Sequence, residues 1–397
     1  MSRLILLLLS IAAAVVTITA SAETVTSAGS ARADGGSSPS LASVRICGDG
    51  GVPRHADRYR YVILQAWAYR AIPRIKARSP RTQVLVYKDM ASTRDDAVRG
   101  GVDQRFLPTG IGYAYANRYH PEWFLKDTTG SRVAWASWPH SWQMDVGSPS
   151  YQRAWARNVA REVRRRGWDG AFVDGAAATM QYPWYLNGRV LAKYPGPGDY
   201  TRATTSFLRR VGPALKRARS LVVTNINDAP PAVWRRWIGY SSGTSKEWWT
   251  KDGTGRGGFL TGKTWSFQMR LLSEAQARRK IFIAVTYGQV DDVAAMHYAR
   301  ASFLLFARGR RSAMTYSTGC GGDSWSPEWT ASLGRPRGRS FRVGPAWRRN
   351  FTGGTVVVNP SSAPVTIPLG ASYLTPTGAP VVSVQLPPGS GLVLRRA

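Results

Sequence analysis

The chain alternates short runs of apolar residues with longer stretches in which apolar residues recur every three or four positions. The short runs, rich in Val, Ile, Leu and Tyr, predict buried strands, and the longer stretches predict amphipathic helices. This alternation is typical of a parallel sheet with helices outside it. Eight such units predict a closed (β/α)8 barrel, the TIM barrel fold. The predicted strands are residues 61–65, 83–88, 142–146, 170–174, 221–225, 237–240, 281–286 and 313–316.

The third strand has two candidates. Residues 111–116 form a strand-like run before 142–146, so either run can be the barrel strand while the other lies in a long loop. The clearest helix, residues 151–166, follows these runs, and Gly167 ends it. An open doubly wound sheet is the competing architecture, but no glycine-rich phosphate loop follows any early strand.

The pattern changes after residue 337. Short apolar runs at residues 355–358, 365–368, 381–386 and 391–394 are separated by Pro and Gly turns. This spacing predicts a small antiparallel β-sandwich domain over residues 338–397. Residues 44–337 would then form the barrel catalytic domain.

The first residues have the pattern of a secretory signal peptide. Arg3 precedes an apolar stretch that is too short to span a membrane, and Ala20-Ser21-Ala22 offers a cleavage site, which assigns residues 1–22. Residues 23–43 are mostly Ser, Gly, Ala and Thr. They bury too little apolar surface to form a core and are predicted to be a flexible linker. We therefore expect a secreted, extracellular protein without a transmembrane anchor.

The formal net charge of +31 suggests an anionic partner, such as an anionic cell-envelope polymer. The charge is carried mostly by arginines that are scattered along the chain, which is also typical of a compositional bias. No nucleic-acid reader motif accompanies the charge, so nucleic acid is not expected as a partner.

The two cysteines of the chain, Cys47 and Cys320, predict one disulfide in an exported protein. A metal site is not expected, because the four histidines stand at no metal-ligand spacing from one another or from a cysteine. No cofactor is predicted either.

Asp174 is the leading catalytic candidate. Active sites of (β/α)8 barrels lie at the C-terminal ends of the strands, and residues 170–174 form an apolar strand that ends in this carboxylate. Gly175 follows and allows the loop to turn close to a substrate. An Asp in this position can also cap a helix or fix a turn.

Glu247, after the sixth predicted strand, is the candidate partner of Asp174. Trp248 and Trp249 follow it, and aromatic rings match the flat C–H faces of sugars. Apolar neighbours raise the pKa of a carboxyl group, as a general acid near neutral pH requires. The alternative is a surface ion pair with Lys246 or a nearby arginine. Because fourth and sixth strands can face each other across a barrel, the sequence predicts a catalytic pair.

Other residues near predicted strand ends are candidates for binding sugar hydroxyls or stacking on sugar rings. Loop hydrogen bonding explains several of them equally well, and either Asp89 or Asp145 could replace Glu247 as the second acid. Asn227 and Gln289 are further candidates of this kind. The predicted substrate-binding residues are Asp89, Asp145, Trp142, Asn225, Trp248 and Tyr287.

Several segments together resemble one family. They are Asp89-Met90, residues 121–125 (Pro-Glu-Trp-Phe-Leu), 142–147 (Trp-Gln-Met-Asp-Val-Gly), 167–174 (Gly-Trp-Asp-Gly-Ala-Phe-Val-Asp) and 358–360 (Val-Asn-Pro). In these segments the chain resembles hypothetical glycosyl hydrolase family 15, the glycoside-hydrolase-like TIM barrels of secreted bacterial proteins. The resemblance implies a nucleophile or key acid at Asp174 and a partner near Glu247, and it indicates no substrate.

The sequence therefore predicts a secreted glycosidase that cleaves an O-glycosidic bond in a polysaccharide or oligosaccharide, with Asp174 as nucleophile and Glu247 as acid/base. A rival interpretation is a non-catalytic barrel that binds a polysaccharide or the cell envelope through a degenerate site. A second carboxylate facing Asp174 distinguishes the two. A third interpretation, a hydrolase of an anionic cell-wall polymer, predicts arginines lining the cleft and activity that falls as salt rises.

Overall fold

The computed structural model describes residues 40–47, 52–180, 183–319, 322 and 325–397. All of them belong to one compact unit, Gly35–Ala397. The predicted signal peptide, the predicted linker up to residue 39, and Cys320 lie outside the described residues. The disulfide between Cys47 and Cys320 therefore stays a prediction. No helix among the described residues is long and apolar enough to cross a membrane.

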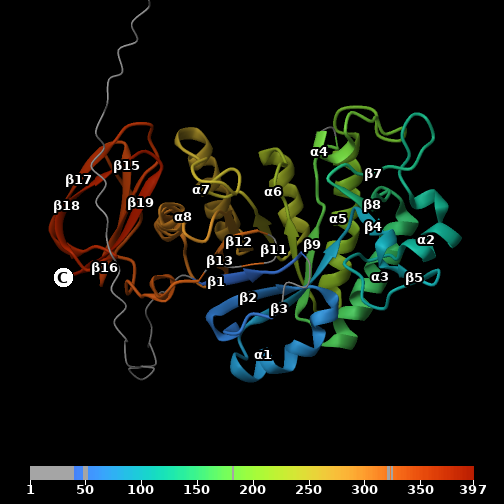
Figure 1. The fold of residues 1–397 in the computed structure, drawn as a ribbon, viewed down its shortest axis with the longest axis horizontal. Helices are drawn as coiled ribbons and strands as arrows, with labels where there is room; N and C mark the ends of the chain where they lie inside the picture. The colour runs from blue at the N-terminus through green and yellow to red at the C-terminus, as the bar shows by residue number, and fades with distance from the viewer. Residues whose placement is uncertain (1–39, 48–51, 181–182, 320–321, 323–324) are drawn as a thin grey trace, which may run out of the picture. The chain divides into compact units, whose positions relative to one another are not determined.

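Eight parallel strands close into a barrel, which confirms the predicted fold class (Figure 1). Each strand pairs with its neighbours along the chain, and the first pairs with the last. In chain order the barrel strands are β1 (Leu41–Val44), β2 (Tyr59–Leu64), β3 (Gln83–Asp89), β9 (Gly170–Asp174), β10 (Leu221–Asn225), β11 (Gly243–Lys246), β12 (Ile281–Tyr287) and β13 (Ser312–Ser317).

Alternate residues of these strands belong to two separate apolar cores. On β2, Tyr61 and Ile63 join a cluster of inward-facing side chains, whereas Val62 and Leu64 join the cluster shared with the outer helices. Side chains alternate between the two faces of a strand, so strands that are buried on both faces read as continuous apolar runs. This double burial explains why most barrel strands could be recognised in the sequence.

Helices surround the barrel. In Figure 1, α5, α6, α7 and α8 appear in this order from right to left. The helix predicted at residues 151–166 is α3. At its start the Ser148 side chain accepts a hydrogen bond from the Tyr151 amide, and at its end Gly167 lies in the left-handed region, with φ 75°. The helices are α1 (Ile72–Arg78), α2 (Tyr113–Tyr119), α3 (Pro149–Arg166), α4 (Pro183–Leu186), α5 (Asp199–Arg217), α6 (Pro231–Tyr240), α7 (Gly262–Ala277) and α8 (Val293–Phe306), with 3-10 helices η1 (Ala56–Arg58), η2 (Ala66–Ala71), η3 (Asp95–Ala97), η4 (Pro121–Trp123) and η5 (Pro327–Thr330).

Two predicted barrel strands are wrong, and two barrel strands were missed. Residues 237–240 end helix α6, in which Trp234, Trp237 and Ile238 are buried at helical spacing. The sixth strand is instead β11, which contains no large apolar residue. Its first residue is glycine because a Cβ there would lie 2.3 Å from Ile281. The first strand is β1, so the expected linker, which ran to Ser43, extends three residues too far.

Neither candidate for the third strand belongs to the barrel. Residues 142–146 overlap β8 (Trp138–Gln143), which pairs antiparallel with β4 (Ser92–Arg94) and β7 (Ala134–Trp135) in an insertion after β3. Residues 111–116 run into α2. This false strand and the missed β1 offset each other in the count. Asp174 therefore still ends the fourth strand, and Glu247 still follows the sixth. The insertion also holds β5 (Val98–Arg99) and β6 (Val102–Asp103).

The C-terminal β domain forms one antiparallel six-stranded sheet, in the order β14-β15-β16-β19-β17-β18. Arg349 ties it to α8, because its buried Nη1 donates to the carbonyl oxygens of Leu304 (2.9 Å) and Ala307 (2.8 Å). The strands are β14 (Phe341–Val343), β15 (Ala346–Phe351), β16 (Gly354–Asn359), β17 (Val365–Leu374), β18 (Pro380–Leu386) and β19 (Ser390–Arg396).

Candidate active site

Asp174 and Glu247 meet at the C-terminal ends of two barrel strands that are separated by one strand. Asp174 is the last residue of β9, and Glu247 directly follows β11. Asn225, the last residue of the intervening strand β10, joins them. Its Nδ2 donates to Oδ1 of Asp174 at 3.0 Å and to Oε2 of Glu247 at 2.8 Å. Oδ1 of Asp174 and Oε2 of Glu247 are therefore no farther apart than the sum of these two hydrogen-bond lengths.

Asp174 is half-buried and accepts hydrogen bonds on both oxygens. The hydroxyl of Tyr87 donates to Oδ2 at 2.8 Å, and the amide of Gly175 donates to Oδ1 at 2.8 Å. Gly175 has φ 80°, and a Cβ at this position would lie 2.5 Å from Oδ1 of Asp89. Glycine is needed here because the chain turns in the left-handed region with no space for a side chain.

Glu247 is held by three side chains. Nδ2 of Asn227 donates to Oε2 at 2.7 Å, Nδ2 of Asn225 shares that oxygen, and the hydroxyl of Tyr287 donates to Oε1. Oδ1 of Asn227 also accepts from the Glu247 amide at 2.9 Å. Burial of the carboxyl group, and next the negative charge of Asp174, raise the pKa of Glu247, although these hydrogen bonds oppose the shift. The alternative interpretation, an ion pair between Glu247 and Lys246, finds no support among the described contacts, since the Lys246 ammonium donates to the Asn227 carbonyl oxygen at 2.7 Å.

Asp89 lies beside this pair as a third carboxylate. It ends β3 and is in register with Asp174 on β9. Its oxygens accept from the Ala91 amide at 2.7 Å and from the Ser92 hydroxyl. Burial, and next the charge of Asp174, raise the pKa of Asp89 to about 6. Three acidic groups thus converge on one edge of the barrel.

Two tyrosines act as neutral donors to the pair. Burial raises the pKa of the Tyr87 hydroxyl well above its usual range, and the charge of Asp174 adds to the shift. The pKa of the Tyr287 hydroxyl is raised in the same way, by burial and by Glu247. Tyr87 was not among the predicted residues. Its signal in the sequence was its position two residues before Asp89, which places both side chains on the same face of the strand.

Trp248 lies at the site, whereas Trp249 belongs to the core. Trp248 has φ 53°, in the left-handed region, and its half-buried ring lies 4.6 Å from that of Tyr287. Trp249 is fully buried and packs against Phe282 and Phe303. Of the two predicted aromatic neighbours of Glu247, only Trp248 is placed to contact a substrate.

Asp145 and Trp142 have contacts elsewhere. Asp145 is buried and accepts from the Lys193 ammonium, the Tyr194 hydroxyl and, at 3.0 Å, the Gly147 amide. None of its described hydrogen bonds reaches Asp174 or Glu247. These contacts join the connection between β8 and α3 to the segment that holds Lys193 and Tyr194, and substrate binding by Asp145 stays a prediction.

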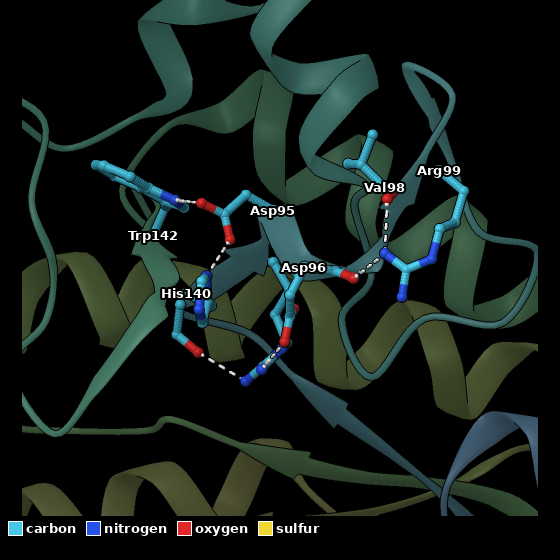
Figure 2. Close-up of polar contacts among 8 residues, drawn as sticks. Asp95, Asp96, Val98, Arg99, His140 and Trp142 are labelled. Carbon is cyan, nitrogen blue, oxygen red and sulfur yellow. Dashed lines mark hydrogen bonds and ion pairs between the residues drawn. The ribbon is translucent and has the colours of Figure 1, made fainter.

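Trp142 is anchored inside the insertion, as Figure 2 shows. Its indole N–H donates to Oδ2 of Asp95 at 2.8 Å, and Nδ1 of His140 contacts the other oxygen of that carboxylate at 2.8 Å. Its ring packs near that of Tyr113, 6.2 Å away. Among the described contacts, none joins Trp142 to the carboxylate pair.

Within the described residues, His, Cys, Asp and Glu form no group of three or more that could hold a metal ion. The acidic groups at the barrel edge are instead satisfied by amide and phenol donors. Asp174 is a half-buried carboxylate that accepts several hydrogen bonds. The amide of Asn225 joins it to Glu247, a carboxyl group with a raised pKa. Such a pair can act as nucleophile and proton donor.

Comparisons with known proteins place the chain among glycosidase-like barrels. The model of hypothetical glycosyl hydrolase family 15 matches residues 76–355. Among solved structures, Ega3 from Aspergillus fumigatus in complex with galactosamine has a TM-score of 0.46 and 9% identity, over 75% of this chain and 97% of that one. An α-amylase from Malbranchea cinnamomea has a TM-score of 0.47 and 10% identity, over 90% and 96% of the two chains. No curated protein matched.

Proposed function

The chain belongs to hypothetical glycosyl hydrolase family 15, and from this premise we propose that it hydrolyses O-glycosidic bonds with Asp174 as nucleophile and Glu247 as acid/base. One observation carries the proposal: a single amide nitrogen of Asn225 donates to both carboxylates. The rival interpretation, a non-catalytic binding barrel with a degenerate site, predicts no second carboxylate facing Asp174. The position of Glu247 therefore favours the enzyme.

The separation of the two groups favours a retaining mechanism. Retaining glycosidases hold their carboxyl groups about 5–5.5 Å apart, whereas inverting enzymes need roughly 6.5–9.5 Å to admit a water molecule. The two bonds through Asn225, 3.0 and 2.8 Å long, hold one oxygen of each carboxyl group against the same nitrogen, which supports the shorter spacing.

In the first step, Oδ2 or Oδ1 of Asp174 attacks the anomeric carbon while the bond to the leaving oxygen breaks. Glu247 gives its proton to that oxygen, and a glycosyl ester forms on Asp174. In the second step, Glu247 takes a proton from water as the water oxygen attacks the same carbon. The ester bond breaks, and both carboxyl groups return to their starting states.

The surroundings of each group fit these roles. Donors contact both oxygens of Asp174 and fix the orientation of its carboxylate, as an attacking group requires. The raised pKa of Glu247 keeps its proton available to the leaving group. When Glu247 is protonated, Tyr287 can accept from it, because a phenol both donates and accepts.

Asn225 is fixed in one orientation between the two carboxylates. Its side chain is buried, and both N–H groups point to carboxylates, so its amide cannot flip without placing oxygen against oxygen. Its Oδ1 is buried as well and lies out of reach of a substrate, so the role proposed for Asn225 is to position the two carboxylates. Asp89 and Trp248 form the proposed binding set.

The substrate is proposed to be a polysaccharide or oligosaccharide met outside the cell, because residues 1–22 have the pattern of an export signal. The test is a screen of the purified chain against bacterial and fungal polysaccharides, with reducing ends as the readout. Asp174→Asn and Glu247→Gln should each lower kcat by about 10²–10⁴-fold. Asp291→Asn, an exposed acid after β12 that pairs with Arg256, is the matched control and should keep full activity. Normal turnover by Asp174→Asn would overturn the proposal.

A further inference from the structure

A hollow of about 430 Å³ lies among the outer helices, between η2 with the start of α1 and the end of α3. None of the residues proposed to act in catalysis lines it. Its wall combines arginines with one aromatic and two aliphatic residues. The lining residues are Tyr69, Arg70, Ile72, Pro73, Arg165, Arg166 and Gly167.

Arginines from two segments line this hollow, and a third segment places another arginine near its aromatic wall. Arg70 belongs to η2, and its Nε donates to the Tyr69 hydroxyl at 3.3 Å. Arg166, at the end of α3, lies with its guanidinium carbon 4.5 Å from the centre of the Tyr69 ring. Arg105, from the loop after β6, approaches Phe106 at 5.5 Å, and Phe106 stacks on Tyr69 with ring centres 5.1 Å apart.

These positive charges have no acidic partners. Some arginines elsewhere do form ion pairs, since Arg94 contacts Asp96 and Arg189 contacts Asp127. No described carboxylate forms an ion pair with the arginines that line the hollow, Arg70, Arg165 and Arg166, or with the nearby Arg105. The hollow therefore carries uncompensated positive charge.

The helix dipole explains part of this cluster. Cations at a helix C-terminus are favourable, which accounts for Arg165 and Arg166 in the last turn of α3. It does not account for Arg70, which comes from η2 and lines the same hollow, or for Arg105, whose charge acts on Tyr69 from the loop after β6. The bonding of Arg70, and next the charges of Arg166 and Arg105, also lower the pKa of the Tyr69 hydroxyl. An anion in the hollow would meet a positive potential from several directions.

We propose that this hollow is a secondary binding site for an anionic polysaccharide, held through a phosphate or sulfate ester group. Guanidinium groups present paired N–H donors that match the oxygens of such esters. The volume suits a charged group with part of a sugar ring. Nucleic acid fits less well, because the aromatic rings stack on each other and are covered by Arg166, whereas single strands need free rings for their bases. The site is independent of the proposed glycosidase activity.

The test compares two variants of equal charge. Arg70→Gln with Arg165→Gln removes two cations from the hollow and leaves Arg166 packed on its rings. Arg153→Gln with Arg157→Gln removes two exposed cations from α3 away from the hollow. Binding of fluorescent dextran phosphate and dextran sulfate is measured by anisotropy at physiological salt, with neutral dextran and a single-stranded oligonucleotide as comparison probes. Thermal unfolding checks that both variants remain folded.

The hollow variant should bind dextran phosphate or dextran sulfate about tenfold or more weakly than the wild type, since each hydrogen bond to a charged group is worth roughly a factor of ten. The preferred ester identifies the natural group. The control variant should lose much less. Equal losses in the two variants would show binding by net charge alone and would overturn the site. Tighter binding of the oligonucleotide, lost only in the hollow variant, would contradict the assignment to a polysaccharide.

Discussion

Replacing Asn225 by Ala removes the amide that donates to both carboxylates. The variant loses a 3.0 Å hydrogen bond to Asp174 and a 2.8 Å hydrogen bond to Glu247. Glu247 keeps its bonds from Asn227 and Tyr287, so the carboxylate stays in place. The change therefore tests the shared donor without dismantling the site.

The size of the effect follows from the type of bond. A hydrogen bond to a charged group contributes about 1.5–3 kcal/mol, and one pKa unit corresponds to about 1.4 kcal/mol. The bond from Asn225 lowers the pKa of Glu247. Its loss should therefore raise that pKa further above its usual range. The bond to Asp174 also steadies the attacking group, so kcat should fall by about ten- to a hundredfold.

The assay is the pH profile of kcat/KM. A general acid works only when protonated, so activity falls as pH rises through the pKa of Glu247. A raised pKa moves this basic limb to higher pH. Tyr87→Phe is the comparison, because it removes a donor from Asp174 alone and should lower kcat without moving the basic limb much. An unmoved basic limb in Asn225→Ala, or a shift to lower pH, would refute the assignment of Glu247.

Three further predictions test the surroundings of the site. Tyr287→Phe should move the basic limb to higher pH, because its hydroxyl lowers the pKa of Glu247; an unchanged profile would argue against this role. Gly175→Ala should abolish most activity, since its Cβ would lie 2.5 Å from Asp89. Gly130→Ala should keep its activity, because Gly130 has a similar φ of 85° but no atom within 4 Å of the added Cβ. Equal activities of the two variants would contradict the crowding at Gly175. Arg349→Met should lower the free energy of unfolding by about 2–4 kcal/mol in urea titrations, because two buried carbonyl groups lose their donor. A change of only a few tenths would mean that Arg349 does not hold the C-terminal sheet to α8.

Strands with apolar residues on both faces could be predicted from the sequence. Residues 83–88, 170–174 and 281–286 were found because neighbouring positions face two different cores, which makes the whole run apolar. Strand β11 could not be found in this way. Its small residues pack against Ile281 and its neighbours, so its burial leaves no apolar signature. The Trp-rich end of α6, with its local apolar run, resembled a strand instead.

Part of the candidate site could be predicted, because the C-terminal ends of parallel barrel strands lie at one edge of the barrel. Asp174 and Glu247 could be paired from the order of the strands alone. The missed β1 and the false strand at residues 142–146 offset each other in that order. Trp142 and Asp145 were misplaced for the same reason, because they lie in an insertion and not at a barrel strand end. The period of strand β3 could have indicated Tyr87, two residues before Asp89, whereas the bridging geometry of Asn225 depends on tertiary contacts that no local pattern encodes.

The most direct test of the central claim is mass analysis of a trapped reaction intermediate. The enzyme is incubated with a 2-deoxy-2-fluoro glycoside of the sugar found in the screen, quenched in acid and digested. The account predicts one added sugar, attached through an ester to Asp174, and a product that keeps its anomeric configuration. A sugar attached to Asp89 or Glu247, or an inverted product formed without any adduct, would contradict it.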